Sequence, residues 1–81
     1  MRVLFSARFV RSFQDAPERV QREFGKQLGH LLRDIRHPSL HAKKYDEARG
    51  IWQVRVNGGW RFYFRIEGDL YELIDIIPHP K

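Results

Sequence analysis

Apolar side chains recur at helical spacing in the first half of the chain. A stripe at steps of 4, 4, 3, 1 and 3 residues is formed by Val20, Phe24, Leu28, Leu31, Leu32 and Ile35. This spacing predicts an amphipathic helix of about five turns. A shorter helix over roughly residues 7–14 is indicated by Phe9 and Phe13, which lie four positions apart. Ser6, directly before it, is the expected N-cap.

Two prolines mark the limits of the longer helix. Pro17 suits a first helical turn, with Asp15 or Ala16 as the capping residue. Pro38 ends the helix, because the residue before a proline is pushed out of the helical region of backbone space. Residues 39–50 then read as a polar connection.

The second half of the chain alternates between apolar and polar positions, as strands do. Segments with this pattern cover residues 51–56, 60–67 and 70–77. Asn57-Gly58-Gly59 suits a tight hairpin turn between the first two of these segments, and Gly68-Asp69 another turn. With a short strand over residues 2–5, the order is β-α-α-β-β-β. We therefore predict one α+β domain over residues 1–81, an antiparallel sheet with both N-terminal helices on one face.

Alternation divides the predicted strands into an apolar and a basic face. The apolar set, expected beneath the helices, is Trp52, Val54, Val56, Trp60, Phe62, Phe64 and Ile66. The opposite set includes Gln53, Arg55, Arg61, Tyr63, Arg65 and Glu67. A solvated sheet face often carries charge, but arginines with so little acid beside them indicate an anion-binding surface. Tyr63 would offer a nucleobase a ring for stacking.

The charge balance agrees with an anionic partner. The chain carries 15 Lys and Arg residues against 10 Asp and Glu, a net charge of +5. Residues 38–66 hold six basic and two acidic residues, whereas residues 67–81 hold one and four. RNA, DNA and an acidic protein all remain open as partners. We expect the anion site in the middle segment.

Composition excludes several other classes of protein. With no cysteine, disulfides, thiolate zinc sites and cysteine nucleophiles are excluded, and a reducing cytoplasm is the expected location. The four histidines lack metal-type spacing, so no metal or other cofactor is expected. No apolar run is long enough to span a bilayer and residues 1–10 lack a signal-peptide core, so no membrane partner is expected. A small enzyme and a binding module both remain possible.

Residues 50–64, GIWQVRVNGGWRFYF, resemble the RelE/ParE superfamily of bacterial toxins from type II toxin–antitoxin systems. They are most similar to the HigB, or plasmid-maintenance killer, branch, whose pattern runs Gly-x-Trp-x-Val-Arg-Val-Asn-x-x-Trp-Arg. The helical half of the chain has only a general similarity. Because those toxins are β-α-α-β-β-β folds of this length, the resemblance implies a RelE-like fold for nearly the whole chain.

Membership of the HigB branch implies ribosome-dependent cleavage of mRNA without a metal. That branch uses a loop His-x-x-Lys, the arginine of the Trp-Arg pair and a histidine at the end of the last strand. At the matching positions stand His41, Lys44, Arg61 and His79. The sequence departs from the branch in two places: the loop lacks a Pro-Leu pair, and residues 77–81 replace an Asp-Tyr-His ending.

These residue types suit attack of a ribose 2′-OH on the adjacent phosphate. Arg61 would offset charge on the phosphorane, since its fork matches phosphate oxygens. His79 would protonate the leaving 5′-oxygen, and either Lys44 or His41 would be the base. The residues expected to hold the RNA are Arg55, Arg65, Lys43 and Tyr63.

Two other functions remain open at this point. A ParE-like toxin would inhibit DNA gyrase through protein contacts and would need no acid–base pair. A non-catalytic member would only bind antitoxin or nucleic acid. The resemblance also implies a cognate antitoxin, an acidic or amphipathic segment laid over the helices or the basic face in a toxin–antitoxin hetero-oligomer. The nuclease would in addition bind the ribosome and mRNA.

Overall fold

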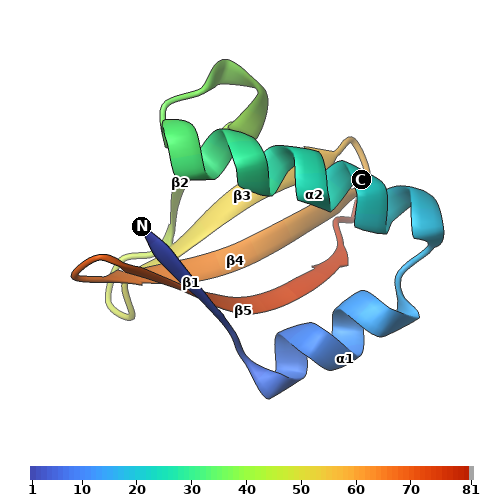
Figure 1. Ribbon diagram of the computed structural model, residues 1–81, viewed down its shortest axis with the longest axis horizontal. Coiled ribbons are helices and arrows are strands. Elements are labelled where there is room, and N and C mark those ends of the chain that lie inside the picture. Colours follow the sequence, from blue (N-terminus) through green and yellow to red (C-terminus); the bar gives the residue numbers. More distant parts are fainter. Residues whose placement is uncertain (81) are drawn as a thin grey trace.

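Over residues 1–80, the part of the chain that the computed structural model describes, five strands form one layer and two helices the other (Figure 1). The elements are β1 (Arg2–Phe5), α1 (Ala7–Asp15), α2 (Glu18–Arg33), a 3-10 turn (Pro38–Leu40), β2 (Lys43–Asp46), β3 (Ile51–Asn57), β4 (Trp60–Glu67) and β5 (Leu70–Pro78). The strands lie in the order β1-β5-β4-β3-β2. This confirms the predicted α+β class.

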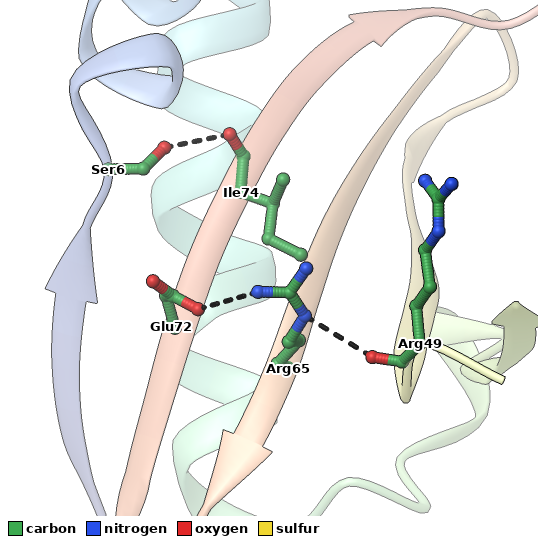
Figure 2. Close-up of polar contacts among 5 residues, drawn as sticks. All are labelled: Ser6, Arg49, Arg65, Glu72 and Ile74. Atoms are coloured by element: carbon green, nitrogen blue, oxygen red, sulfur yellow. Dashed lines mark hydrogen bonds and ion pairs between the residues drawn. The ribbon is translucent and has the colours of Figure 1, made fainter. Parts of the chain in front are cut away.

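Ser6 begins α1, as predicted. Its hydroxyl oxygen accepts a hydrogen bond from the Phe9 amide at 3.0 Å and donates one to the Ile74 carbonyl of β5 at 2.8 Å (Figure 2). A capping side chain satisfies a backbone donor that the helix itself leaves without a partner. Here the same side chain also fixes the start of α1 against the sheet.

The limits of α2 differ from the prediction at both ends. Pro17 itself occupies the N-cap position, where we expected Asp15 or Ala16. The helix ends at Arg33, several residues before Pro38, which instead begins the 3-10 turn. Proline therefore marks a structural boundary at both places, but one residue or one turn away from the predicted position.

The apolar faces of the helices and strands meet in the core. Among the fully buried side chains are Phe9, Leu31, Leu40, Val54, Phe62, Phe64, Leu73 and Ile76. Phe24 of α2 connects the layers, with ring centroids 5.2 Å from Phe9 and 5.0 Å from Phe62. Ile66, which we expected in the core, is 41% exposed. It lies next to the β4–β5 turn, which extends beyond the helices (Figure 1).

The sheet differs from the prediction at both edges. β1 pairs with β5 in parallel, Arg2 opposite Leu70, so the sheet is mixed rather than wholly antiparallel. Residues 43–46, which we expected in a polar connection, form β2 and pair antiparallel with β3. A short strand with adjacent lysines is typical of a sheet edge, and it lacks the apolar alternation that indicates a strand. Because β2 pairs with β3, the chain that follows the 3-10 turn lies along the edge of the sheet.

Within residues 1–80, no helix is both long and apolar enough to cross a membrane.

Candidate functional site

A cationic pocket opens on the face of the sheet opposite the core. It has a volume of about 380 Å³ and is lined by His41, Ala42, Lys43, Gln53, Arg55 and Arg61. The register makes Lys43 the neighbour of Gln53, and Arg55 the neighbour of Arg61. No carboxylate of the described residues is among this lining. Positive side chains gathered without an acid focus a field that attracts anions.

Arg61 is held by the turn between β3 and β4. Its Nη1 donates to the carbonyls of Asn57 at 2.6 Å and Trp60 at 2.9 Å. Both bonds use one nitrogen of the guanidinium, so Nη2 and Nε can face an oxyanion in the pocket. The turn therefore orients the side chain that the sequence placed at the centre of the chemistry.

Asn57 organises that turn and connects it to α2. Its Oδ1 accepts from the Gly59 amide at 2.8 Å, and its Nδ2 donates to Glu23 Oε1 at 2.8 Å. A bulge between Arg55 and Asn57 ends the regular β3–β4 ladder at this point. Asn57, the asparagine of the pattern in residues 50–64, thus stabilises the turn that holds Arg61 and does not itself line the cationic pocket.

His41 enters the pocket from a strained backbone. Its φ of 47° and ψ of 42° are left-handed, which costs about 1–2 kcal/mol for a residue with a Cβ. It caps the 3-10 turn, and two residues later β2 begins. The strained residue thus turns the chain onto the sheet edge, with its exposed imidazole beside Lys43.

The structure does not bring Lys44 to the pocket. Lys44 pairs with Trp52, and its Nζ lies 5.3 Å from the centroid of that ring, which packs against the core. Because neighbouring residues of a strand point to opposite faces, Lys43 lines the pocket and Lys44 does not. The His-x-x-Lys spacing therefore places its two ends on different faces.

Arg65 is also separate from the pocket. Its Nη1 lies 3.3 Å from Glu72 Oε1 of β5, and its Nε donates to the Arg49 carbonyl at 3.3 Å (Figure 2). The guanidinium is thus neutralised and connects β4 to β5 and to the β2–β3 turn. These contacts give it a structural role instead of a position beside Arg61.

Tyr63 adjoins the pocket but is almost covered, with 9% of its surface exposed. Its hydroxyl lies 3.3 Å from Gln53 Oε1, and its ring contacts Tyr45 edge-on at 4.9 Å. Burial, and next the neighbouring Tyr45, raise the pKa of the Tyr63 hydroxyl above its ordinary value of 10.0, so it stays a neutral donor. Tyr63 therefore positions Gln53, which strand alternation placed on the basic face but which is not among the residues expected to hold the RNA.

His79 lies near the pocket without lining it. Its amide donates to the Gly59 carbonyl at 2.7 Å, directly after the pairing of Pro78 with Trp60. The half-buried residue is therefore held at the turn end of the sheet, the end where Arg61 also lies. His79 directly follows the last residue of β5, and its role in the chemistry stays a prediction.

A second cleft of about 550 Å³ shares His41 and Arg55 with the cationic pocket and reaches α2. In it, the rings of His30 and His37 stack with centroids 3.9 Å apart. Desolvation, and then the charges of His37, Arg33 and Lys26, lower the pKa of His30. In the described part of the chain, no three His, Cys, Asp or Glu side chains are placed to hold a metal ion.

No protein-family model matches the sequence, and no curated protein is similar enough to match it. Solved structures do match. The YoeB/ParE toxin from Agrobacterium tumefaciens superposes with a TM-score of 0.79 and 16% identity, covering 99% of this chain and 100% of that one. The YoeB dimer from Staphylococcus aureus gives a TM-score of 0.81 and 13% identity, covering 99% and 98%.

A chain of the RelBE2 toxin–antitoxin complex from Mycobacterium tuberculosis gives a TM-score of 0.76 and 20% identity, covering 96% of both chains. These likenesses span essentially the whole domain. At identities this low they establish the architecture. The chain has the RelE-like fold of the RelE, YoeB and ParE toxins.

Proposed function

We propose that this protein is the toxin of a type II toxin–antitoxin system and cleaves ribosome-bound mRNA in the cytoplasm. The observation that carries this proposal is the cationic pocket, where β2, β3 and β4 gather Lys43, Arg55 and Arg61 beside an imidazole. The shared fold supports the toxin class, and the pattern in residues 50–64 favours a HigB-like nuclease within it. A phosphate of single-stranded RNA fits such a lining.

The proposed reaction needs no metal. The 2′-oxygen attacks the adjacent phosphorus, the bond from phosphorus to the 5′-oxygen breaks, and a 2′,3′-cyclic phosphate and a 5′-hydroxyl result. Arg61, with Arg55 and Lys43 beside it, offsets the charge on the phosphorane. The preset orientation of Arg61 by two carbonyls reduces the rearrangement needed in the transition state.

Proton transfer is assigned to the two histidines. His41 takes the proton of the 2′-hydroxyl, since its imidazole lies in the pocket whereas Lys44 lies on the other face. His79, held at the turn end of the sheet, gives a proton to the leaving 5′-oxygen. An imidazole exchanges protons near neutral pH, so one can act as base and the other as acid.

A translation assay with programmed ribosomes tests this function. The wild-type protein should cut mRNA in the ribosomal A site, and Arg61→Ala should abolish cutting while the purified protein stays folded. Arg61→Lys keeps the charge but loses the paired N–H donors of the guanidinium, and should retain only part of the activity. Folded wild-type protein that cuts no transcript on several codons would rule out the nuclease. If the folded protein instead lowered DNA supercoiling by purified gyrase, the result would point to a ParE-like toxin.

The antitoxin is proposed to dock on the helix side. Phe5, Phe9, Val10, Phe13, Gln14 and Phe24 line an apolar groove of about 360 Å³, and Phe5 and Val10 are 43% and 41% exposed. Such a groove accepts the apolar face of an amphipathic helix. Val10→Asp should weaken a co-expressed complex in gel filtration and leave mRNA cleavage by the separated toxin intact. A complex unchanged by this substitution would move the antitoxin to another surface.

A further inference from the structure

Tyr45 occupies a bulge in β2 beside the cationic pocket. Lys44 pairs with Trp52 and Asp46 pairs with Ile51, which leaves Tyr45 without a partner in the ladder. Bulges of this kind re-aim a side chain, often next to a functional site. The Tyr45 ring packs edge-on against Tyr63, with centroids 4.9 Å apart and an angle of 65° between the planes. The aromatic pair thus lies on the sheet face that carries the pocket.

The ring of Tyr45 is presented to solvent. The residue is 62% exposed, the highest value among the large hydrophobic side chains that are exposed in residues 1–80. It borders a shallow depression of about 150 Å³, also lined by Ile51, Tyr63, Ile74, Asp75 and Ile77. A rigid aromatic ring supported along one edge, with apolar side chains beside it, is the kind of surface on which a nucleobase stacks.

The depression and the cationic pocket are neighbours. Tyr63 lines the depression, and its hydroxyl contacts Gln53, which lines the pocket. On the other side, Ile77 of the depression pairs with Arg61 of the pocket. Single-stranded RNA presents a phosphate and a base within the span of one nucleotide, and the two surfaces offer a cationic and an apolar contact side by side.

The charges assign one part of the nucleotide to each surface. Asp75 is the acid among the described residues that line the depression, and its Oδ1 accepts from the Ile76 amide at 2.9 Å. A carboxylate at this position repels phosphate but tolerates a base. Asp46, beside Tyr45, is paired with Arg49 at 3.6 Å. The phosphate is therefore directed to the pocket and the base to the depression.

We propose that Tyr45 and this depression bind a nucleobase of single-stranded RNA whose phosphate occupies the cationic pocket. The inference rests on the proposed function and extends it from phosphate binding to base binding. It also changes the sequence interpretation: Tyr63 is the buried support, and Tyr45 is the stacking residue. Stacking of this kind tolerates any base, so Tyr45 contributes affinity more than sequence preference.

Binding to a short 2′-O-methyl RNA, which cannot be cleaved, tests the proposal. The oligomer carries one 2-aminopurine, whose fluorescence falls on stacking, and a matched oligomer lacks a base at that position. Tyr45→Ala and Tyr45→Leu should weaken binding of the complete oligomer about 5- to 150-fold, the range for loss of one stacked base. Tyr45→Phe should keep the affinity and the quenching. Leu32→Ala, a matched change on an exposed apolar residue of α2, should change neither.

The oligomer without the base identifies the contact. Wild type should lose about as much affinity for it as Tyr45→Ala loses for the complete oligomer, and the variant should lose little more. Equal binding of the complete oligomer by wild type and Tyr45→Ala would overturn the base site. The same loss of affinity by Tyr45→Ala on both oligomers would also overturn it. In either case the proposed function would stand if Arg61→Ala still abolished cleavage. Wild type that binds neither oligomer would overturn the base site, and the ribosome assay with Arg61→Ala would decide the proposed function separately. An effect of Tyr45→Ala on the antitoxin complex alone would make this a protein interface and overturn the base site.

Discussion

Arg55 and Arg61 lie directly opposite each other on β3 and β4. Like charges in this arrangement destabilise a sheet. The fold nevertheless places both at the cationic pocket, whose lining holds no carboxylate of residues 1–80. A pair of like charges that lowers the stability of the fold is typical of a functional site.

Arg55→Gln should therefore stabilise the protein and weaken its binding to RNA. We expect a gain of roughly 0.2–1 kcal/mol in the free energy of unfolding, because the cross-strand repulsion is removed while a polar side chain is kept. Arg65→Gln is the matched control. It removes the ion pair with Glu72 and should lower the stability. Urea unfolding measures both, and a loss of stability with Arg55→Gln would contradict the interpretation.

Asn57→Ala should reduce activity through Arg61 although Asn57 does not line the pocket. The substitution removes the bonds to Gly59 and Glu23, which should cost about 1–3 kcal/mol and loosen the turn that orients Arg61. Cleavage by the still folded protein should fall. Glu23→Gln keeps an oxygen for the Asn57 amide to donate to, so it should have a much smaller effect on both measurements. Unchanged cleavage with Asn57→Ala would show that the turn does not position Arg61.

Ser6→Ala should destabilise the protein by about 1–2 kcal/mol. It removes both the cap of α1 and the bond to the Ile74 carbonyl of β5, and leaves a part-buried acceptor without its donor. Thermal unfolding followed by circular dichroism measures the loss. Ser12→Ala, within the same helix, should change the stability by less than half as much. Equal effects of the two substitutions would remove the special role of Ser6.

Stability should fall as the medium becomes acidic, in part because of His30. Its pKa in the folded protein lies below the ordinary value of 6.5, so the unfolded chain binds the proton more tightly. Folding stability from this group is therefore complete above 6.5 and declines as the pH drops from 6.5 to the lowered pKa. His30→Gln should reduce the difference in melting temperature between pH 7.5 and pH 5. An unchanged difference would show that the desolvation of His30 and the charges of His37, Arg33 and Lys26 do not govern it.

The element pattern of the fold was predictable because the core repeats at regular spacing. The alternation of Phe62 and Phe64 and the cap at Ser6 are local signals, and both are confirmed. β2 was missed because an edge strand with adjacent lysines carries no apolar period. The parallel pairing of β1 was missed as well, since its partner lies some 68 residues further along the chain, and no local pattern reports that.

The site was predictable only in part. Strand alternation put Arg55 and Arg61 on one face, and the structure brings them together. The positions of Lys43 and Lys44 depended on β2, so their assignment to faces needed the strand that the pattern missed. Arg65 shares the alternation of Arg61, but its partners Glu72 and Arg49 come from other segments. Spacing identifies a face and does not show which charges on it are already paired.

The pairing of β1 with β5 has a consequence for synthesis. Residues 2–5 find their neighbours only at residues 70–73, and α1 is fastened to the same strand through Ser6. Contacts between distant segments form late, and a nascent chain lacks β5 until residues 70–73 have left the ribosome. Until then β4 also lacks one of its two neighbours. During synthesis the sheet that carries the arginines therefore cannot be complete until residues 70–73 have left the ribosome.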